Sequence, residues 1–348
     1  MSRRSRPVVI GAALACLLAS KGSAAPPSAD AARTFDFTYA VTVKDLPAGR
    51  HTVHAWIPLA STDPAQSVIV EDVTSPVPTS ETRDPEYGNR ILHADLSGQT
   101  GRTARLAVRY RVTRQTFSGE PAAHDVPAAR FLSADRLVPI DGRMKELADR
   151  VTAGKRDPSE IARAVYDYVF QSLRYDKSGT GWGRGDAVWA CDAKRGNCTD
   201  FHSLFIALMR AEKIPARFEI GFPLPENVRE GEIPGYHCWA EFLVPDRGWI
   251  PVDISEAWKA PPKRDFFFGH LDANRVRFST GRDILLAPRQ QGEALNYFVY
   301  PYVEVDGQPY AAIDRRFSFQ EISAGGSGGG SRQESGLGGD RGPLVAKR

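Results

Sequence analysis

A cysteine in the second half of the sequence has the local setting that nucleophilic catalysis by a thiol requires. Cys198 follows Asn197, a good helix cap, so its side chain is expected in the first turn of a helix. There, unpaired amide groups and the positive end of the helix dipole would stabilise a thiolate, the form of cysteine that attacks a carbonyl. The same amides could hold the oxyanion formed by that attack. The sequence therefore predicts a reactive thiol at Cys198.

His237 and Asp253 are the expected base and the acid that orients it. They fall in two runs that alternate like β-strands, 235–244 and 249–254, with a turn at 245–248 between them. Folding the strands about that turn places Asp253 within about two residues of His237 on the partner strand. Taken alone, His237 is better explained as a structural histidine and Asp253 as a strand-end carboxylate. Their order and sequence contexts together favour a triad in which the carboxylate fixes the imidazole tautomer.

The sequence around these residues resembles the three blocks of the transglutaminase-like superfamily. The blocks are Gly196-Asn197-Cys198-Thr199-Asp200-Phe201, Gly235-Tyr236-His237-Cys238-Trp239-Ala240-Glu241-Phe242 and Gly248-Trp249-Ile250-Pro251-Val252-Asp253. The resemblance covers roughly residues 130–320 and is densest over 157–255. It implies a papain-like core with Cys198 as nucleophile, His237 as general base and Asp253 as orienting acid. It implies no cofactor, and no acidic cluster of the calcium-loop type is present in the sequence.

The implied reaction is attack of the thiolate on a carboxamide, through an acyl-enzyme. Water would then make the protein a cysteine peptidase or amidase, and an amine would make it a transglutaminase. Both outcomes stay open, since only the access of the acceptor differs. The predicted partner is a protein or peptide amide, with amides of the cell envelope as one candidate, and hydrolysis is slightly preferred over transfer to an amine.

Two alternatives compete with catalysis. Zinc-ligand types occur at Cys191, Cys198, His202, His237 and Cys238. However, there is no paired Cys-x-x-Cys, and strand alternation separates His237 from Cys238, so no metal site is predicted. The second alternative is a non-catalytic cell-envelope module that binds a protein or glycan and keeps the triad only as scaffold.

Two tryptophans are candidate walls of the substrate cleft. Trp239 shares a strand face with His237, and Trp182 lies in the glycine-rich loop 179–186. Ordinary core packing explains either tryptophan equally well. The segment 223–234, rich in Pro, Glu and Gly, could be a lid over the cleft or a surface loop.

The elements that must position these residues predict an α+β fold. Alternating runs separated by turn residues over 34–118 predict an N-terminal β-sandwich, and the catalytic domain is assigned to 119–322. Within it, a helix is expected from Asp157, a cap followed by proline. Strands at 297–305 and 310–313 are expected to complete the catalytic sheet.

The ends of the chain predict an exported protein. Residues 1–25 have the three parts of a signal peptide, 26–33 read as a linker, and 323–348 as a disordered Gly/Ser-rich tail. The net charge is +3, and the first 25 residues hold four basic residues and no acid, so the remainder carries about 3 − 4 = −1. We therefore predict a periplasmic or secreted location, no stable membrane span after cleavage, and no nucleic acid partner.

After removal of the leader, three cysteines remain. An odd number in an oxidising compartment leaves at least one thiol unpaired. The hypothesis is that Cys191 and Cys238 pair with each other or lie buried, leaving Cys198 free.

Overall fold

The structure is a computed structural model that describes residues 32–99, 101–119 and 128–322. The predicted signal peptide, the predicted tail and residues 26–31 of the predicted linker lie outside these ranges. Residues 32 and 33 already belong to the first strand. No helix in the described ranges is long and apolar enough to cross a membrane.

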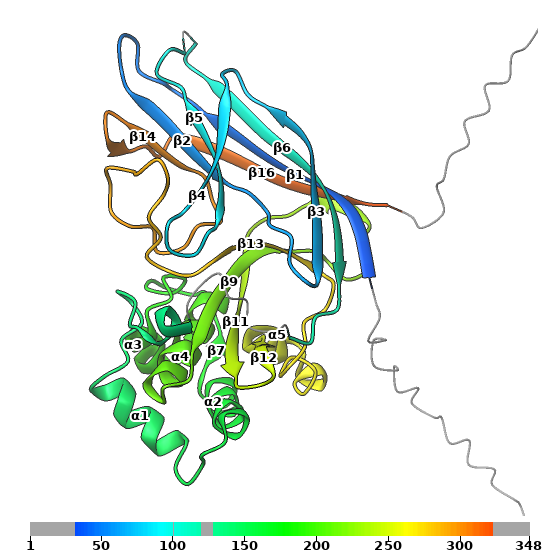
Figure 1. The fold of residues 1–348 in the computed structure, drawn as a ribbon, viewed down its shortest axis with the longest axis vertical. Helices are drawn as coiled ribbons and strands as arrows, with labels where there is room; N and C mark the ends of the chain where they lie inside the picture. The colour runs from blue at the N-terminus through cyan, green and yellow to red at the C-terminus, as the bar shows by residue number, and fades with distance from the viewer. Residues whose placement is uncertain (1–31, 100, 120–127, 323–348) are drawn as a thin grey trace, which may run out of the picture.

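Two five-stranded antiparallel sheets form a β-sandwich, drawn at the top of Figure 1. One sheet has the order β10-β16-β1-β6-β3, and the other has the order β15-β14-β2-β5-β4. The first sheet comprises Glu230–Glu232 (β10), Ile313–Glu321 (β16), Ala32–Val43 (β1), Ala104–Gln115 (β6) and Gln66–Thr74 (β3). The second comprises Gln308–Pro309 (β15), Tyr302–Val305 (β14), Val53–Pro58 (β2), Arg90–Asp95 (β5) and Thr79–Arg83 (β4).

Strand β1 shows why this part of the sequence forms a sheet. Its buried residues alternate strictly with less buried ones, and Phe35, Phe37 and Tyr39 point into the core. A period of two is the signature of a strand with one covered face. The predicted N-terminal sandwich is therefore observed.

The C-terminal strands lie elsewhere than expected. β16 pairs with β1, and β14 pairs with β2, so residues 302–321 belong to the sandwich and not to the catalytic sheet. Both ends of the described chain build this unit, which therefore crosses the sequence-based division at residue 119.

The second unit, which carries the predicted site residues, contains a four-stranded antiparallel sheet with the order β12-β11-β9-β13. Its strands are Gly248–Val252 (β12), His237–Val244 (β11), Ala216–Pro223 (β9) and Arg275–Thr280 (β13). Its helices are Arg143–Val151 (α1), Pro158–Ser172 (α2), Ala187–Ala193 (α3), Cys198–Ala211 (α4) and Ile254–Lys259 (α5). Short 3-10 helices span Ala128–Leu132 and Pro261–Lys263, and Arg174–Tyr175 (β7) pairs in parallel with Arg195–Gly196 (β8).

Helix α4 is the centre of this unit. All 14 of its residues are buried, and it contacts α1, α2 and α3 as well as β9 and β11. The predicted α+β fold, with a cysteine-bearing helix packed on an antiparallel sheet, is confirmed. The predicted start of α2 is confirmed too, because the Asp157 side chain accepts hydrogen bonds from the Ser159 and Glu160 amides.

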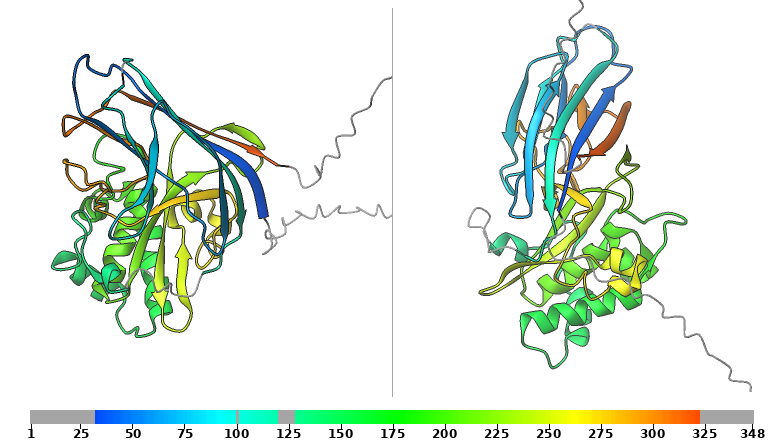
Figure 2. Two further views of the ribbon diagram at one scale, coloured as in Figure 1. Left: turned by 45° about the horizontal axis from the view of Figure 1, so that its top comes forward. Right: turned by 90° about the vertical axis from the view of Figure 1, so that its right-hand side faces the viewer.

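The sandwich and the catalytic sheet share one core. Phe222 of β9 packs at 5.5 Å from Phe37 and 4.3 Å from Phe317 between ring centroids, and Phe278 of β13 joins them. The two views of Figure 2 show β9 and β13 running up against the sandwich. The buried Gln66 side chain also bonds the backbone N–H and C=O of Arg277, which fixes β13 to the sandwich.

The segment 223–234 is attached to the sandwich. Its strand β10 pairs with β16. Arg33 of β1 donates to the carbonyls of Pro225 at 3.1 Å and Val228 at 3.0 Å. The segment is therefore held by hydrogen bonds at both the strand and the loop that precedes it.

Candidate active site

The start of α4 is fixed by two reciprocal caps. Asn197 accepts a hydrogen bond from the Thr199 amide at 3.0 Å, and Asp200 accepts one from the Asn197 amide at 2.9 Å. This arrangement is a capping box, which satisfies amides that have no partner within the helix. Cys198 is the first residue of the helix, so its own amide stays directed at the space in front of α4.

The glycine-rich loop is tied to the same cap. Asp200 also accepts from the amides of Gly183 at 2.7 Å and Gly185 at 3.0 Å. Gly185 has φ +63°, and a Cβ there would collide with the side chains of Ser203 and Thr199. Glycine is therefore required at this position, because the loop must approach the helix closely in a left-handed conformation.

His237 and Asp253 form a short, buried hydrogen bond. The His237 Nε2 atom lies 2.6 Å from Asp253 Oδ2, and the two residues are 4% and 0% exposed. Asp253 is also the cap of α5, because its Oδ1 accepts from the Glu256 amide at 3.0 Å. Nδ1 of His237 is thereby the ring nitrogen available to the thiol.

Arg275 completes the environment of Asp253. Its Nη1 donates to Asp253 Oδ2 at 2.8 Å, the oxygen that also bonds His237. Burial alone would raise the pKa of Asp253, but the charges of His237 and Arg275 hold that pKa well below its ordinary value. The carboxylate is therefore ionised throughout the neutral range.

Cys198 and His237 interact as hydrogen-bonding partners. Burial disfavours the thiolate, but hydrogen bonds with Cys238 and His237 outweigh it and bring the pKa of Cys198 well below its ordinary value. Burial also opposes the charge on His237, yet Asp253 and the bond to Cys198 raise the pKa of His237 to about 10. These directions favour a thiolate–imidazolium pair at neutral pH.

Cys238 lies on the helix side of β11 and reaches the same thiol. Its Sγ is 3.9 Å from Thr199 Oγ1 and 3.8 Å from His202 Nδ1, and it bonds Cys198. Burial raises the pKa of Cys238 well above its ordinary value, so it stays a protonated donor. Both His237 and Cys238 therefore reach the Cys198 thiol, although strand alternation predicted that they point to opposite faces. Cys191, Cys198 and Cys238 are all free and buried.

His202 supports the acid from inside the core. Its Nε2 accepts a hydrogen bond from the Ile254 amide at 3.1 Å, next to Asp253. Burial lowers the pKa of His202 to about 4, so the ring is neutral at pH 7. No group of three or more metal-ligating side chains that could hold an ion occurs within the described ranges.

The two predicted cleft tryptophans take different positions. Trp239 is 0% exposed and packs beneath the Arg275 guanidinium, 5.1 Å from its ring centroid, with Phe117 and Leu271. Trp182 is partly exposed, and its ring lies 5.9 Å from Lys177 Nζ. Trp239 thus belongs to the support of the triad, whereas Trp182 lies at the surface beside it.

Two cavities flank His237 and share Pro223 and Glu256 as walls. The first, of about 260 Å³, is also lined by Tyr175, Lys177, Pro234, Gly235, Tyr236 and Lys259. The second, of about 240 Å³, is also lined by Leu224, Pro225, Glu226, Ala260, Lys263, Phe267, Asp272, Asn274 and Arg275. Together they form a groove across the imidazole, and we call them the lysine arm and the paired arm.

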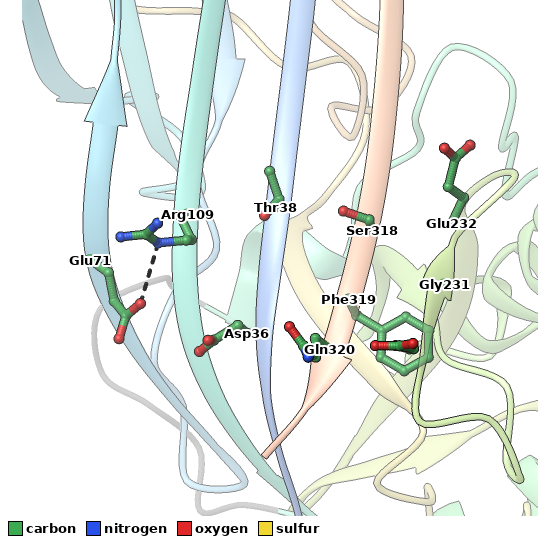
Figure 3. A pocket seen from close by; sticks show the side chains of 10 residues that line it. Asp36, Thr38, Glu71, Arg109, Gly231, Glu232, Ser318, Phe319 and Gln320 are labelled. Atoms are coloured by element: carbon green, nitrogen blue, oxygen red, sulfur yellow. Dashed lines mark ion pairs between the residues drawn. The ribbon is translucent and has the colours of Figure 1, made fainter. Parts of the chain in front are cut away.

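A third cavity, of about 640 Å³, lies on the outer face of the sandwich sheet that contains β1 (Figure 3). Its walls are Asp36, Thr38, Glu71, Arg109, Glu230, Gly231, Glu232, Ser318, Phe319 and Gln320. Arg109 pairs with Glu71 at 3.4 Å. These walls contain neither a thiol nor an imidazole.

Three residues of the site were not predicted as such from the sequence. Tyr236 joins the start of β11 to α4, because its hydroxyl lies 2.8 Å from Thr199 Oγ1 and accepts from Asn197 Nδ2 at 3.1 Å. Tyr236 and Asp200 sit beside predicted site residues, which is a usable local signal. Arg275 comes from β13 and carries no such signal.

Comparison with known proteins agrees with this geometry. Residues 145–254 match the family model of the transglutaminase-like superfamily. This chain carries a transglutaminase-like segment. The matched segment runs from α1 to the first residue of α5 and includes all three predicted triad residues.

Related proteins extend beyond the transglutaminase-like segment. An uncharacterized protein of Haemophilus influenzae is 29% identical over 233 residues, which cover 58% of this chain and 63% of that protein. A crystal structure from Cytophaga hutchinsonii, described as a candidate cysteine protease, aligns with a TM-score of 0.56 and 18% identity. That alignment covers 84% of this chain and 92% of the other, and it shows a shared fold. The periplasmic domain of TgpA from Pseudomonas aeruginosa aligns with a TM-score of 0.35 and 16% identity over 65% of this chain and 91% of that domain.

Proposed function

We propose that this protein is a thiol-dependent enzyme that acts on carboxamides through an acyl-enzyme at Cys198. The observation that carries the proposal is the hydrogen-bonded set of Cys198, His237 and Asp253, in which His237 lines both cavities of the groove. The match of residues 145–254 to the transglutaminase-like superfamily supports a thiol enzyme in general.

The first half-reaction uses the charges already in place. The Cys198 thiolate attacks the amide carbon, and the oxyanion accepts a hydrogen bond from the Cys198 amide at the start of α4. His237 then gives its proton to the leaving nitrogen, and the C–N bond breaks. Asp253 and Arg275 keep the imidazole oriented during this transfer.

The second half-reaction returns the enzyme to its starting state. His237, now neutral, takes a proton from water or from an amine as that molecule attacks the thioester. The acyl group leaves, and the thiolate–imidazolium pair is restored. We propose that water is the usual acceptor and that the substrates are peptide amides of the cell envelope. The basic, apolar leader of the sequence supports a periplasmic or secreted location.

The test is trapping of the acyl-enzyme by intact-protein mass spectrometry. We expect peptide amide substrates, with and without a primary amine, to give an adduct on Cys198 that is lost in Cys198→Ala. Cys191→Ala is the matched control, because Cys191 is also buried and free but lies in α3, outside the groove. Turnover by Cys198→Ala, or an unmodified Cys198 in the presence of iodoacetamide, would contradict the proposal and favour a non-catalytic binding module.

A further inference from the structure

The paired arm of the groove has no surplus charge. Each of its carboxylates is matched by a cation: Glu226 with Lys263 at 3.0 Å, Asp272 with Arg275 at 3.2 Å, and Glu256 with Lys259 at 2.6 Å. An amine substrate entering this arm would therefore find every acid already neutralised.

The lysine arm, unlike the paired arm, contains a lysine without an ion-pair partner in the described part of the chain. Lys259 belongs to the pair with Glu256, but no carboxylate of the described residues lies within ion-pair distance of Lys177. The Lys177 ammonium instead lies 5.7 Å from the Tyr175 ring centroid and 5.9 Å from that of Trp182. Contacts of a cation with two aromatic faces hold it in place without neutralising it.

This cation is close to the reacting groups. His237 and Lys177 line the same cavity. Tyr175, whose ring face carries the ammonium, lines that cavity too, and Lys259 Nζ lies 4.2 Å from the same ring centroid. His237 is paired with Asp253, so Lys177 is the cation lining the groove that has no ion-pair partner among the described residues.

We propose that the acyl donor carries a carboxylate next to the scissile amide and that Lys177 binds it. The inference rests on the proposed function and deepens it by naming the substrate class, an anionic peptide amide. Lys177 then acts as a specificity-determining residue, and Trp182 contributes by positioning its ammonium.

Two alkylating agents that differ in charge test the site directly. Iodoacetate carries a carboxylate, iodoacetamide does not, and peptide mass spectrometry reports modification at Cys198. We expect the ratio of the iodoacetate rate to the iodoacetamide rate to fall about 3- to 10-fold in Lys177→Gln, as removal of one positive charge from the cavity beside His237 predicts. The attraction of iodoacetate to His237 is present in both proteins and cancels in the comparison.

Lys155→Gln is the matched control. Lys155 is exposed in the connection between α1 and α2, before the start of the 15-residue helix α2, which is about 22 Å long and whose other end leads to Tyr175. In Lys155→Gln, the ratio of the iodoacetate rate to the iodoacetamide rate should equal that of the wild type. Lys177→Arg should keep most of the preference for iodoacetate.

Turnover is tested with two peptide amides that carry Glu or Gln beside the scissile bond. A third peptide with a free α-carboxylate at that position distinguishes a side-chain carboxylate from an α-carboxylate as the group that Lys177 binds. We expect kcat/KM to favour a carboxylate-bearing peptide in the wild type and not in Lys177→Gln. An unchanged ratio of iodoacetate to iodoacetamide rates in Lys177→Gln would overturn this inference but would not contradict the proposed function. Failure of both reagents at Cys198 would overturn the proposed function and this inference with it.

Discussion

The residues around Cys198 oppose the effect of burial on its thiol. A thiol that is 2% exposed would ordinarily stay protonated, since the low dielectric disfavours its anion. His237 and Cys238 offset this by donating to the sulfur, and Asp253 in turn holds the proton on His237. The ionisation of the Cys198 thiol therefore depends on three residues: Cys238 and His237, which bond the sulfur, and Asp253, which bonds His237.

This arrangement predicts a distinct pH dependence. Because the pKa of Cys198 is low and that of His237 is about 10, the reactive pair should persist from mildly acidic pH up to pH 9. The value of kcat/KM should fall above pH 10, because His237 loses the proton that the leaving group needs. In His237→Ala the thiol pKa should return to at least its ordinary value, so iodoacetamide alkylation at pH 6 should slow on the order of 100-fold. An equal rate at pH 6 in wild type and His237→Ala would contradict this dependence on His237.

At the scale of elements, the start of α4 and the glycine-rich loop form one unit. Asp200 joins them through the amides of Asn197, Gly183 and Gly185. Burial raises the pKa of Asp200 to about 6, so it is ionised at pH 7 and bonds these donors as a carboxylate. The position of the nucleophile therefore depends on an aspartate that does not touch it.

Removing this carboxylate should be costly. We expect Asp200→Ala to lower the free energy of unfolding by about 2–4 kcal/mol, because buried amides lose their acceptor. Urea denaturation measures the change. Asp157→Ala is a suitable control, since Asp157 caps α2 in an exposed setting, and about 1 kcal/mol is expected there. Equal costs at the two caps would show that the loop contacts contribute nothing.

At the scale of the whole molecule, the sandwich supports the substrate groove. Pro223, Leu224, Pro225 and Glu226 line the paired arm, and Arg33 of the sandwich bonds the Pro225 carbonyl and Asn274 Oδ1. The groove wall is thus built on a strand that lies almost 200 residues earlier in the chain. Under the proposed function, the sandwich would take part in substrate binding without lying at the reacting atoms.

Arg33→Ala should separate binding from chemistry. We expect KM for peptide amides to rise several-fold, because the wall from Pro223 to Glu226 loses its anchor, while iodoacetamide alkylation of Cys198 stays unchanged. Steady-state kinetics and alkylation rates measure the two effects. Lys44→Ala, which removes an exposed ion pair with Asp314 just beyond the same strand, should change neither. An unchanged KM in Arg33→Ala would show that the segment from Pro223 to Glu226 keeps its position without its hydrogen bonds to the sandwich.

Local chemistry made much of the site predictable from the sequence. The helix caps at Asp157 and Asn197 are set by their own side chains and the amides two or three residues on. Strands β11 and β12 pair about the turn expected at 245–248, as neighbouring strands usually do, and this pairing brings Asp253 to His237. Each of these features needs only a short stretch of chain.

Only the tertiary structure determined what depends on distant segments. Alternation in 302–321 indicates strands but not which sheet they join, and pairing with β1 and β2 decides it. Arg275 reaches Asp253 from β13, which pairs with β9, and Trp239 is buried beneath it because the sandwich loops cover that face. Burial and partner choice follow from the packing of the whole chain, so a periodic pattern predicts an element without predicting its neighbours.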